Sequence, residues 1–323
     1  MYAAPQGSPN GNLHPDIRKC QAPLAPVPAS VQFEDMGQLP KNNDQSNRLI
    51  EAAGLAAAAE RAAVECGNFL LESFRQPKGV YEEKSPGDLV SEIDLESQRM
   101  AQQILLEYTP GARFLCEEDT VEEAGDSSSD ELTWIVDPLD GTANFLHRLP
   151  LFAVSIAAAR GRTLLAAAIC SPFTEEVFTA APGHGAVLNG EQIQVSEEKV
   201  LGRSLLATGW PFREKEILAA YLEVFTRIFW ETQGIRRMGA AAIDLAYTAA
   251  GRLEGFWEYG LKKWDVAAGA LILNEAGGMV SDFAGGDGWW ESGDIVASNG
   301  LIHSALLETA STPNGIVDLR PER

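Results

Sequence analysis

The segment Trp134–Phe145, which reads W-I-V-D-P-L-D-G-T-A-N-F, holds the side chains best suited to chemistry in this sequence. A predicted strand ends at Asp137, and Asp140 follows three residues later, so both carboxylates and the Leu139 carbonyl can face one cation. Oxygen ligands of this kind bind Mg²⁺, Mn²⁺ or Ca²⁺ rather than zinc. The segment therefore predicts a site for a hard divalent cation.

The next two residues, Gly141 and Thr142, expose backbone N–H groups at a predicted helix start, where anions bind. A cation site beside an anion site indicates a phosphate ester. The pattern D-P-x-D-G is also typical of a surface turn with an Asx cap, and taken alone that interpretation has about equal weight.

Further carboxylates come from distant segments. Glu117 and Glu118 follow a predicted strand and can reach the same rim. Asp94 and Asp265 each stand at the predicted N-cap of a helix, a position that needs no function, because a cap alone stabilises a helix by about 1 kcal/mol. Together, the four acids favour a cation site more strongly than any one of them does.

Several other catalytic machineries are missing from the sequence. The four histidines form no HExxH pair, which disfavours a zinc hydrolase. The chain has no Gly-Lys dipeptide of a Walker A loop, no GxGxxG, no DxD nucleophile pair, no thiolate phosphatase loop and no GxSxG elbow. What remains is a set of carboxylates with a few hydroxyls and glycines.

Charge and cysteine content limit the partners and the compartment. The 323 residues carry a net charge of −21, of which −12 lies between residues 82 and 131. Nucleic acid and anionic membrane are poor partners for such a chain, because both are bound through clustered cations. Four dispersed cysteines, with no signal peptide and no apolar span, predict a soluble cytoplasmic protein. The acidic run 119–131 is interpreted as a solvated loop.

The elements that must position these residues follow two patterns. Residues 1–45 are Pro-rich and predict a flexible tail. A long Ala-rich helix runs from Ser46 to near Pro77, and a second helix runs from Asp94 to Tyr108. Tight connections then separate short strands, and such connections join antiparallel neighbours. The predicted strands are 113–116, 133–136, 152–159, 164–170, 177–180 and 186–188.

From Ser204 onward, strands and helices alternate, which indicates an α/β layer arrangement. The predicted strands are 204–208, 235–238, 253–258, 279–282 and 295–298, and the predicted helices are 215–229, 240–250 and 265–276, with one more at the end. We therefore predict an N-terminal α+β subdomain at 46–200 with the metal site, a C-terminal α/β subdomain at 201–310 and a tail at 311–323.

In order and in content, these segments resemble the inositol monophosphatase family of lithium-sensitive, Mg²⁺-dependent phosphatases. The resemblance covers roughly residues 47–310. The matching segments are Asp88–Asp94, Glu117-Glu118, Trp134–Phe145, His147, Pro150, Ser155, Gly234–Arg236, Gly239–Ala241, Glu258 and Trp264–Gly278.

The resemblance implies a role for each matched residue. Two or three Mg²⁺ ions, replaceable by Mn²⁺, would be held by Glu117, Asp137, Asp140, Asp265 and the Leu139 carbonyl, with Glu118 supporting a weakly bound ion. Asp94 and Thr142 would position and deprotonate the attacking water, and Glu117 would be the third catalytic residue. The substrate would be contacted by Gly141 and Thr142 at the phosphate, by Asp140 and Asp265 beside it, and by Gly239, Ala240, Ala241 and Glu258 near the alcohol.

The resemblance also implies a layered αβαβα sandwich and a homodimer. The sandwich agrees with the antiparallel and then alternating pattern of elements. Two positions depart from the family: Ala240 stands where Ser or Thr is common, which leaves the substrate open, and Cys116 replaces a small residue. We interpret Cys116 as a small buried side chain and not as a nucleophile.

We therefore predict Mg²⁺-dependent hydrolysis of inositol 1-phosphate, or of a similar small polyol phosphate, by direct attack of a metal-activated water. The alternatives in the same superfamily are fructose-1,6-bisphosphatase, histidinol phosphatase and 3′-phosphoadenosine nucleotidase. A non-catalytic interaction protein is the alternative from another class.

Overall fold

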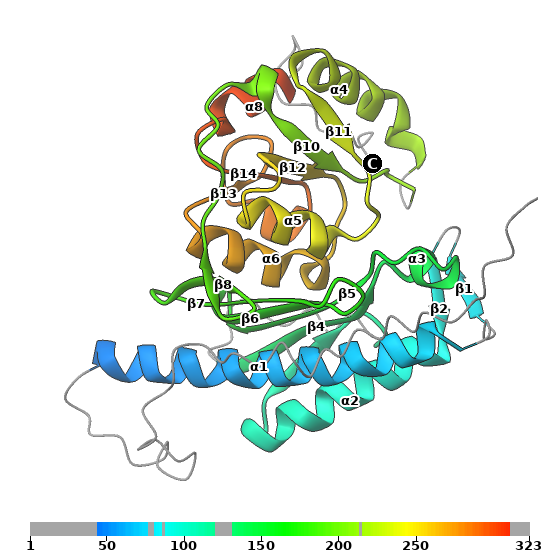
Figure 1. Ribbon diagram of the computed structural model, residues 1–323, viewed down its shortest axis with the longest axis vertical. Helices are drawn as coiled ribbons and strands as arrows, with labels where there is room; N and C mark the ends of the chain where they lie inside the picture. Colours follow the sequence, from blue (N-terminus) through cyan, green and yellow to red (C-terminus); the bar gives the residue numbers. More distant parts are fainter. Residues whose placement is uncertain (1–43, 77–80, 86–87, 120–130, 213–214, 311–323) are drawn as a thin grey trace, which may run out of the picture.

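The computed structural model of the protein describes residues 44–76, 81–85, 88–119, 131–212 and 215–310. Its elements form five layers (Figure 1). Helices α1 (Asp44–Phe74) and α2 (Glu92–Tyr108) cover one face of a seven-stranded sheet. Helices α5 (Ala241–Ala249) and α6 (Lys263–Glu275) lie between this sheet and a five-stranded sheet, and α4 (Leu218–Glu231) and α8 (His303–Ala310) cover the outer face. The predicted αβαβα sandwich is confirmed.

The seven-stranded sheet has the strand order β3-β4-β5-β6-β7-β8-β9. Its strands are β3 (Arg113–Cys116), β4 (Leu132–Asp140), β5 (Ala153–Arg160), β6 (Thr163–Ser171), β7 (Glu176–Ala181), β8 (Gly185–Leu188) and β9 (Glu191–Ile193). From β4 onward every neighbouring pair is antiparallel, as the short connections predict, whereas β3 runs parallel to β4. The three-residue β9 was not among the predicted strands.

The five-stranded sheet has the order β11-β10-β12-β14-β13. Its strands are β10 (Leu205–Thr208), β11 (Gly234–Arg236), β12 (Gly255–Glu258), β13 (Met279–Ser281) and β14 (Ile295–Ser298). β10 runs parallel to β11 and to β12, and β14 is antiparallel to β12 and to β13. The alternation of strands and helices after residue 204 thus produces the predicted α/β layers.

Alternate residues along these strands bury against different helix layers. In β10, Leu206 packs in the cluster under α4 and α8, and Ala207 packs in the cluster around α5 and α6. In β12, Trp257 packs in the cluster under α4 and α8, and Phe256 packs in the cluster around α5 and α6. Because side chains alternate between the faces of a strand, two adjacent apolar residues fit a strand covered on both sides.

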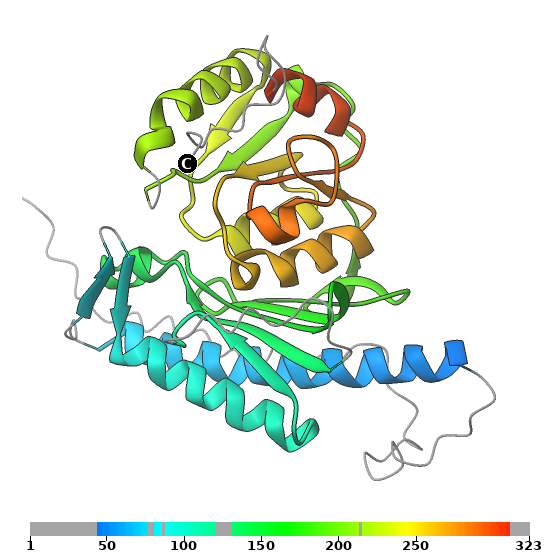
Figure 2. The same ribbon diagram turned by 180° about the vertical axis from the view of Figure 1, so that it is seen from behind.

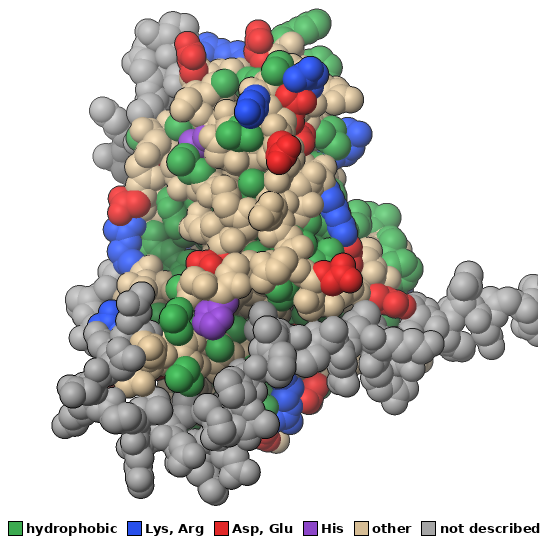
Figure 3. All heavy atoms as spheres, turned by 60° about the vertical axis from the view of Figure 1, so that its left-hand side comes forward, with side chains coloured by type: hydrophobic (Ala, Val, Ile, Leu, Met, Phe, Trp, Pro, Cys, Tyr) green, Lys and Arg blue, Asp and Glu red, His purple; other side chains and the backbone are tan. Residues whose placement is uncertain are grey.

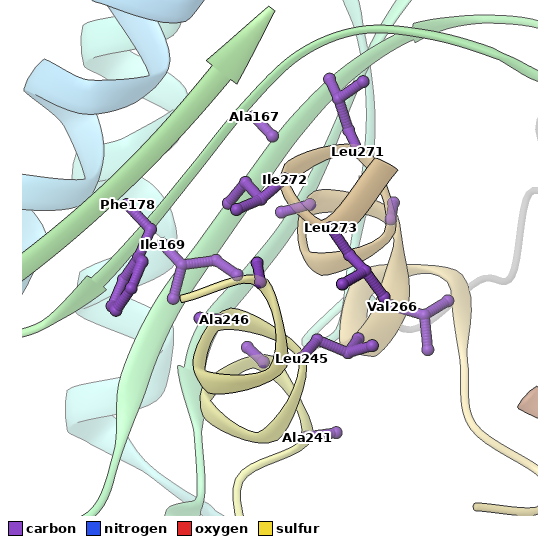
Figure 4. Close-up of a cluster of buried hydrophobic side chains, with 14 of the residues drawn as sticks. Ala167, Ile169, Phe178, Ala241, Leu245, Ala246, Val266, Leu271, Ile272 and Leu273 are labelled. Atoms are coloured by element: carbon purple, nitrogen blue, oxygen red, sulfur yellow. The ribbon is translucent and has the colours of Figure 1, made fainter. Parts of the chain in front are cut away.

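Small side chains let the helices approach the seven-stranded sheet closely. A Cβ atom added to Gly67 of α1 would lie 2.7 Å from the Cys170 Sγ of β6. On the opposite face, Leu245 of α5, Ile272 of α6 and Ile169 of β6 pack in one cluster (Figure 4). Viewed from behind, α2 runs alongside α1 beneath the same sheet (Figure 2).

The remaining described elements are short. They are the hairpin of β1 (Tyr81–Ser85) and β2 (Asp88–Ser91), helices α3 (Thr142–Leu146) and α7 (Trp289–Ser292), and the 3₁₀ turns Leu201–Arg203 and Lys215–Ile217. The hairpin was missed because a strand that reads Y-E-E-K-S has no apolar alternation. Among the described residues, no helix has the length and apolarity needed to cross a bilayer.

The predicted starts of α2 and α6 are wrong by two residues, and α4 begins at Leu218, three residues after its predicted start. α2 begins at Glu92 and α6 at Lys263, so Asp94 and Asp265 lie in the first turn of their helices and are not N-caps. α1 begins at Asp44, inside the predicted tail 1–45. The rest of that tail, most of the acidic loop 119–131 and the tail 311–323 lie outside the described residues. The division into subdomains near residue 200 stays a prediction.

Candidate active site

A β-bulge places the two carboxylates of β4 on one side of the sheet. Asp137 pairs with Ser155 and Asp140 with Ala153, so Pro138 and Leu139 stand opposite a single residue of β5. Residues three apart point to opposite faces of a regular strand, and the extra residue of a bulge restores them to the same face. The strand therefore does not end at Asp137, as predicted, but continues to Asp140, and both carboxylates line one cavity.

Hydrogen bonds hold this bulge in place. The Leu139 N–H donates to Asp137 Oδ1 at 2.9 Å, and the Ser97 hydroxyl of α2 donates to the Pro138 carbonyl at 2.9 Å. Asp137 is 1% exposed, so its carboxylate is fixed by the fold.

The chain leaves β4 through Gly141, which has a φ of 90°. This backbone conformation favours glycine, and a Cβ atom here would lie 3.0 Å from the Leu151 carbonyl oxygen. α3 then begins at Thr142, as predicted, and its first intrahelical bond runs from the Phe145 N–H to the Gly141 carbonyl at 3.0 Å. The amides that precede Phe145 therefore lack partners within α3.

The Thr142 hydroxyl lies between two acceptors. Its Oγ1 atom is 3.1 Å from Asp94 Oδ1 and 3.0 Å from the Leu139 carbonyl oxygen. Since a hydroxyl has one proton, it donates to one of the two at a time and retains lone pairs for a further donor such as water. Asp94, buried in the first turn of α2, reaches the cavity through this contact.

The acids after β3 separate into two environments. The Glu117 N–H donates to the Val136 carbonyl at 3.2 Å, which continues the pairing of β3 with β4 and brings Glu117 to the cavity. The Glu118 N–H instead donates to Gln98 Oε1 of α2 at 3.0 Å, and Glu118 is not among the described residues that line the cavity. Cys116 is buried, and burial raises the pKa of its thiol, in agreement with a structural role.

The second half of the chain closes the cavity from the opposite side. Asp265 is held because its Oδ2 atom accepts the Lys262 N–H at 2.7 Å, and the Ser155 hydroxyl of β5 donates to the Trp264 carbonyl at 3.2 Å. Asp140 Oδ2 accepts the Ala242 N–H at the start of α5 at 2.8 Å, a bond that joins the two halves of the fold. Each of the two carboxylates is thus held in place by a backbone amide.

This last bond explains the departure at Ala240. Ala240 is the N-cap residue of α5 and makes no side-chain cap hydrogen bond, whereas a Ser or Thr there supplies an oxygen for the first amides. The Asp140 carboxylate, from a different element, occupies that role.

The cavity has a volume of about 270 Å³ and gathers most of the predicted site residues. Those that line it are Glu117, Asp137, Leu139, Asp140, Gly141, Thr142, Gly239, Ala240, Ala241, Glu258 and Asp265. Sequence reasoning did not assign Ala143, Asn144, Gly209, Phe212, Arg237, Asp244 and Leu261 to the site, and these residues also line it. For Asp244, a signal exists, because an acid within the apolar run A-A-A-I-D-L-A is unusual.

Burial and mutual repulsion dominate the electrostatics. Burial raises the pKa of Asp137 well above its ordinary value, and Glu117, Asp140 and Asp265 raise it further. The pKa of Asp140 is raised to about 7, mainly by burial and then by Asp265, although the Ala242 N–H bond opposes the shift. Buried carboxylates that repel one another are stabilised in their charged form by a cation.

The donor set suits a hard cation. No described His or Cys lines the cavity, and the acidic groups there are carboxylates, which bind Mg²⁺ or Mn²⁺. Over the described ranges, no group of three or more His, Cys, Asp or Glu side chains forms a ready-made metal site. The carboxylates instead line an open cavity, and backbone amides or neighbouring elements fix their positions.

Comparison with known proteins bears on this geometry. The model of the inositol monophosphatase family matches residues 51–313. The chain belongs to this family. Members of this family are Mg²⁺-dependent phosphatases.

The relatives of the chain carry two kinds of name. A protein of Pseudomonas aeruginosa named Nus factor SuhB is 44% identical over 254 residues, which cover 78% of this chain and 93% of that protein. An inositol-1-monophosphatase of Mesorhizobium japonicum is 41% identical over 254 residues, covering 78% and 94%. A solved structure, the extragenic suppressor protein suhB of Bartonella henselae, has a TM-score of 0.75 and 38% identity and covers 80% of this chain and 98% of that chain.

Proposed function

We propose that this protein is a Mg²⁺-dependent phosphomonoesterase that hydrolyses inositol 1-phosphate or a similar small polyol phosphate. One observation carries the proposal: Asp137 and Asp140 of β4, whose pKa values are raised by burial and by neighbouring carboxylates, line the same cavity as Asp265 of α6 and Thr142 of α3. The Thr142 hydroxyl in turn contacts Asp94 of α2. Family membership and the Mesorhizobium relative support the reaction class.

The metal ligands in this proposal are Glu117, Asp137, Asp140, Asp265 and the Leu139 carbonyl. A bound Mg²⁺ or Mn²⁺ lowers the pKa of a water molecule and offsets charge on the phosphate. Two or three ions are expected from the resemblance. The supporting role predicted for Glu118 stays a prediction.

The chain's own groups supply positioning and proton transfer. Thr142 Oγ1 accepts a hydrogen bond from the attacking water while it donates to Asp94, and Asp94 takes up the proton. Glu117, which lines the same cavity, is the third catalytic residue of the proposal. The Gly141 and Thr142 amides hold the phosphate oxygens at the start of α3. No covalent nucleophile is needed, which agrees with a buried Cys116 whose thiol pKa is raised.

The test is phosphate release from a panel of four esters, with Mg²⁺ and with EDTA. The esters are inositol 1-phosphate, fructose 1,6-bisphosphate, histidinol phosphate and 3′-phosphoadenosine 5′-phosphate. We expect Mg²⁺-dependent release, fastest from inositol 1-phosphate, and a loss of about a hundredfold or more in Asp137→Asn and in Asp265→Asn. The matched control is Glu308→Gln, which makes the same chemical change at an exposed acid of α8. Full activity of the two Asn variants would refute the metal site.

A second candidate function is an interaction role, favoured by the Pseudomonas relative named a Nus factor. We infer that direct binding of nucleic acid is absent, because the chain carries a net charge of −21. On the face shown in Figure 3, Lys and Arg are interspersed with Asp and Glu. Salt-dependent binding of RNA to the full chain would contradict this inference.

We also propose a homodimer, a cytoplasmic location and inhibition by Li⁺, each on the strength of the family resemblance. Sedimentation velocity of the full chain, cell fractionation and Li⁺ titration of phosphate release measure the three properties directly.

A further inference from the structure

Asp244 is a buried carboxylate in the cavity that the proposed chemistry does not use. It lies in α5, whose buried side chains are otherwise nearly all apolar, and it is 1% exposed. It lines the cavity, and within the described part of the chain its Oδ1 atom has no hydrogen-bond partner. Burying a carboxylate oxygen without a hydrogen-bond partner costs free energy of folding. A bound ligand that donates a hydrogen bond to this oxygen would account for an acid at this position.

The charges around Asp244 come from other residues that line the cavity. Burial raises the pKa of Asp244, Glu258 and Asp140 raise it further, and Arg237 opposes them. Glu258 is packed against Gly209, where an added Cβ atom would lie 1.9 Å from Oε1, so the carboxylate position depends on the absence of a side chain. We name the part of the cavity formed by six of its lining residues the alcohol end. These residues are Gly209, Phe212, Arg237, Asp244, Glu258 and Leu261.

Arg237 adds a donor to these two acceptors. Its guanidinium carbon lies 5.9 Å from the centre of the Phe212 ring, a cation–π contact. In its ionised form, the alcohol end therefore presents carboxylates, which only accept hydrogen bonds, beside a guanidinium, which only donates them. Vicinal hydroxyl groups match both, because each hydroxyl donates one bond and accepts others.

Other alcohol substituents match less well. An ammonium group could donate to Asp244 but would be repelled by Arg237, and a second phosphate would meet the charges of Asp244 and Glu258. An aromatic ring without hydroxyls would leave the Asp244 carboxylate unpaired. The charge pattern thus discriminates in favour of neutral, hydroxyl-rich leaving groups.

We propose that Asp244 is a specificity-determining residue that, together with Glu258, accepts hydrogen bonds from the hydroxyls of a polyol monophosphate. This inference rests on the proposed function, since it assigns the substrate class of the same cavity. It assigns the selection between substrates to Asp244 of α5, which is not one of the proposed metal ligands.

The experiment compares two esters of the same phosphate group, inositol 1-phosphate and phenyl phosphate, whose ring has no hydroxyls. Their kcat/KM values are measured for the wild type, Asp244→Asn, Asp244→Ala and the control Glu308→Gln, with thermal unfolding of each. We expect the ratio of kcat/KM, inositol 1-phosphate over phenyl phosphate, to fall roughly 10- to 100-fold in both Asp244 variants, the range for losing a charged hydrogen bond. The control should keep the wild-type ratio.

A parallel fall for both esters would show that Asp244 only supports the fold and would overturn the inference, as would an unchanged ratio. Binding of myo-inositol to the full chain, followed by saturation-transfer NMR, separates this inference from the proposed function. If the wild type hydrolyses neither ester, the proposed function is wrong. Binding of myo-inositol that is lost in Asp244→Asn still supports the role of Asp244, and equal binding by wild type and variant refutes it.

Discussion

The substitution Asp140→Asn should lower catalytic activity and, as the pH rises, increase the stability of the fold relative to that of the wild type. Asp140 is buried, and its pKa is raised from 3.8 to about 7 in the folded protein. A rise of this size corresponds to about 4 kcal/mol, at about 1.4 kcal/mol for each pH unit. Because the folded-state pKa lies above the unfolded value, this stability is fully present below about pH 4 and is lost as the pH rises toward 7. An asparagine side chain carries no charge and escapes that loss.

The structure sets the size of the effect at each pH. In the variant, the amide oxygen of the new side chain can still accept the Ala242 N–H, but its amide N–H groups lack an assigned acceptor, at a cost of about 1–3 kcal/mol at any pH. The free energy of unfolding of the variant minus that of the wild type should therefore increase between pH 4 and pH 8, and the contribution of Asp140 itself is on the order of 4 kcal/mol. The loss of its repulsion on Asp137 acts in the same direction. The cost of the unpaired amide N–H groups is the same at every pH, so it does not affect the predicted increase of this stability difference with pH.

Urea unfolding in EDTA at pH 4, 6 and 8 measures this difference, with Glu308→Gln as the control whose difference should not change. Addition of Mg²⁺ should stabilise the wild type by about 2.7 kcal/mol at a hundredfold excess over Kd, and the variant by much less. A stability difference that stays constant from pH 4 to pH 8 would refute the raised pKa. Equal stabilisation of both proteins by Mg²⁺ would refute the role of Asp140 as a ligand.

Two further predictions concern single contacts. Thr142→Ala should lower kcat by about a hundredfold and change KM little, because the Thr142 hydroxyl positions the attacking water. Thr142→Ser should recover the activity, and a change confined to KM would instead assign Thr142 to substrate binding. Gly209→Ala should raise KM for inositol 1-phosphate several-fold with little change in melting temperature, since the new Cβ displaces only the flexible end of Glu258; a strong loss of stability instead would show that the backbone has moved.

Local sequence was sufficient to find the centre of the site. The residue types and spacing from Asp137 to Thr142 predicted a carboxylate pair followed by a helix start, and both are present. Strand and helix types were also predictable, because the apolar runs of β5 to β8 and the Ala-rich face of α1 reflect layers that bury one or both faces. Element ends were less certain, as the starts of α2 and α6 show, because caps depend on contacts beyond the local sequence.

Other features depended on contacts between distant segments. The bulge that turns Asp137 and Asp140 to one side is visible only in the register with β5. The cap that Asp140 provides for α5 joins residues about a hundred apart and makes the missing hydroxyl of Ala240 tolerable. Neither the bulge nor the cap could be inferred from the spacing of residues along the chain. For the bulge, the spacing misleads, because a strand of regular pleat would place the two carboxylates on opposite faces.

The amino-acid sequence by itself determined which groups could do chemistry: oxygen ligands, a hydroxyl and a glycine turn, in an order that resembles one family. Only the tertiary structure decided which of them act together, because packing of α5 and α6 on the seven-stranded sheet removes Asp137, Asp140 and Asp265 from water and sets their charges against one another. The same packing brought Asp244 into the cavity from an apolar helix. A pKa and a binding contact both depend on burial and distance, and the order of residues along a chain specifies neither directly.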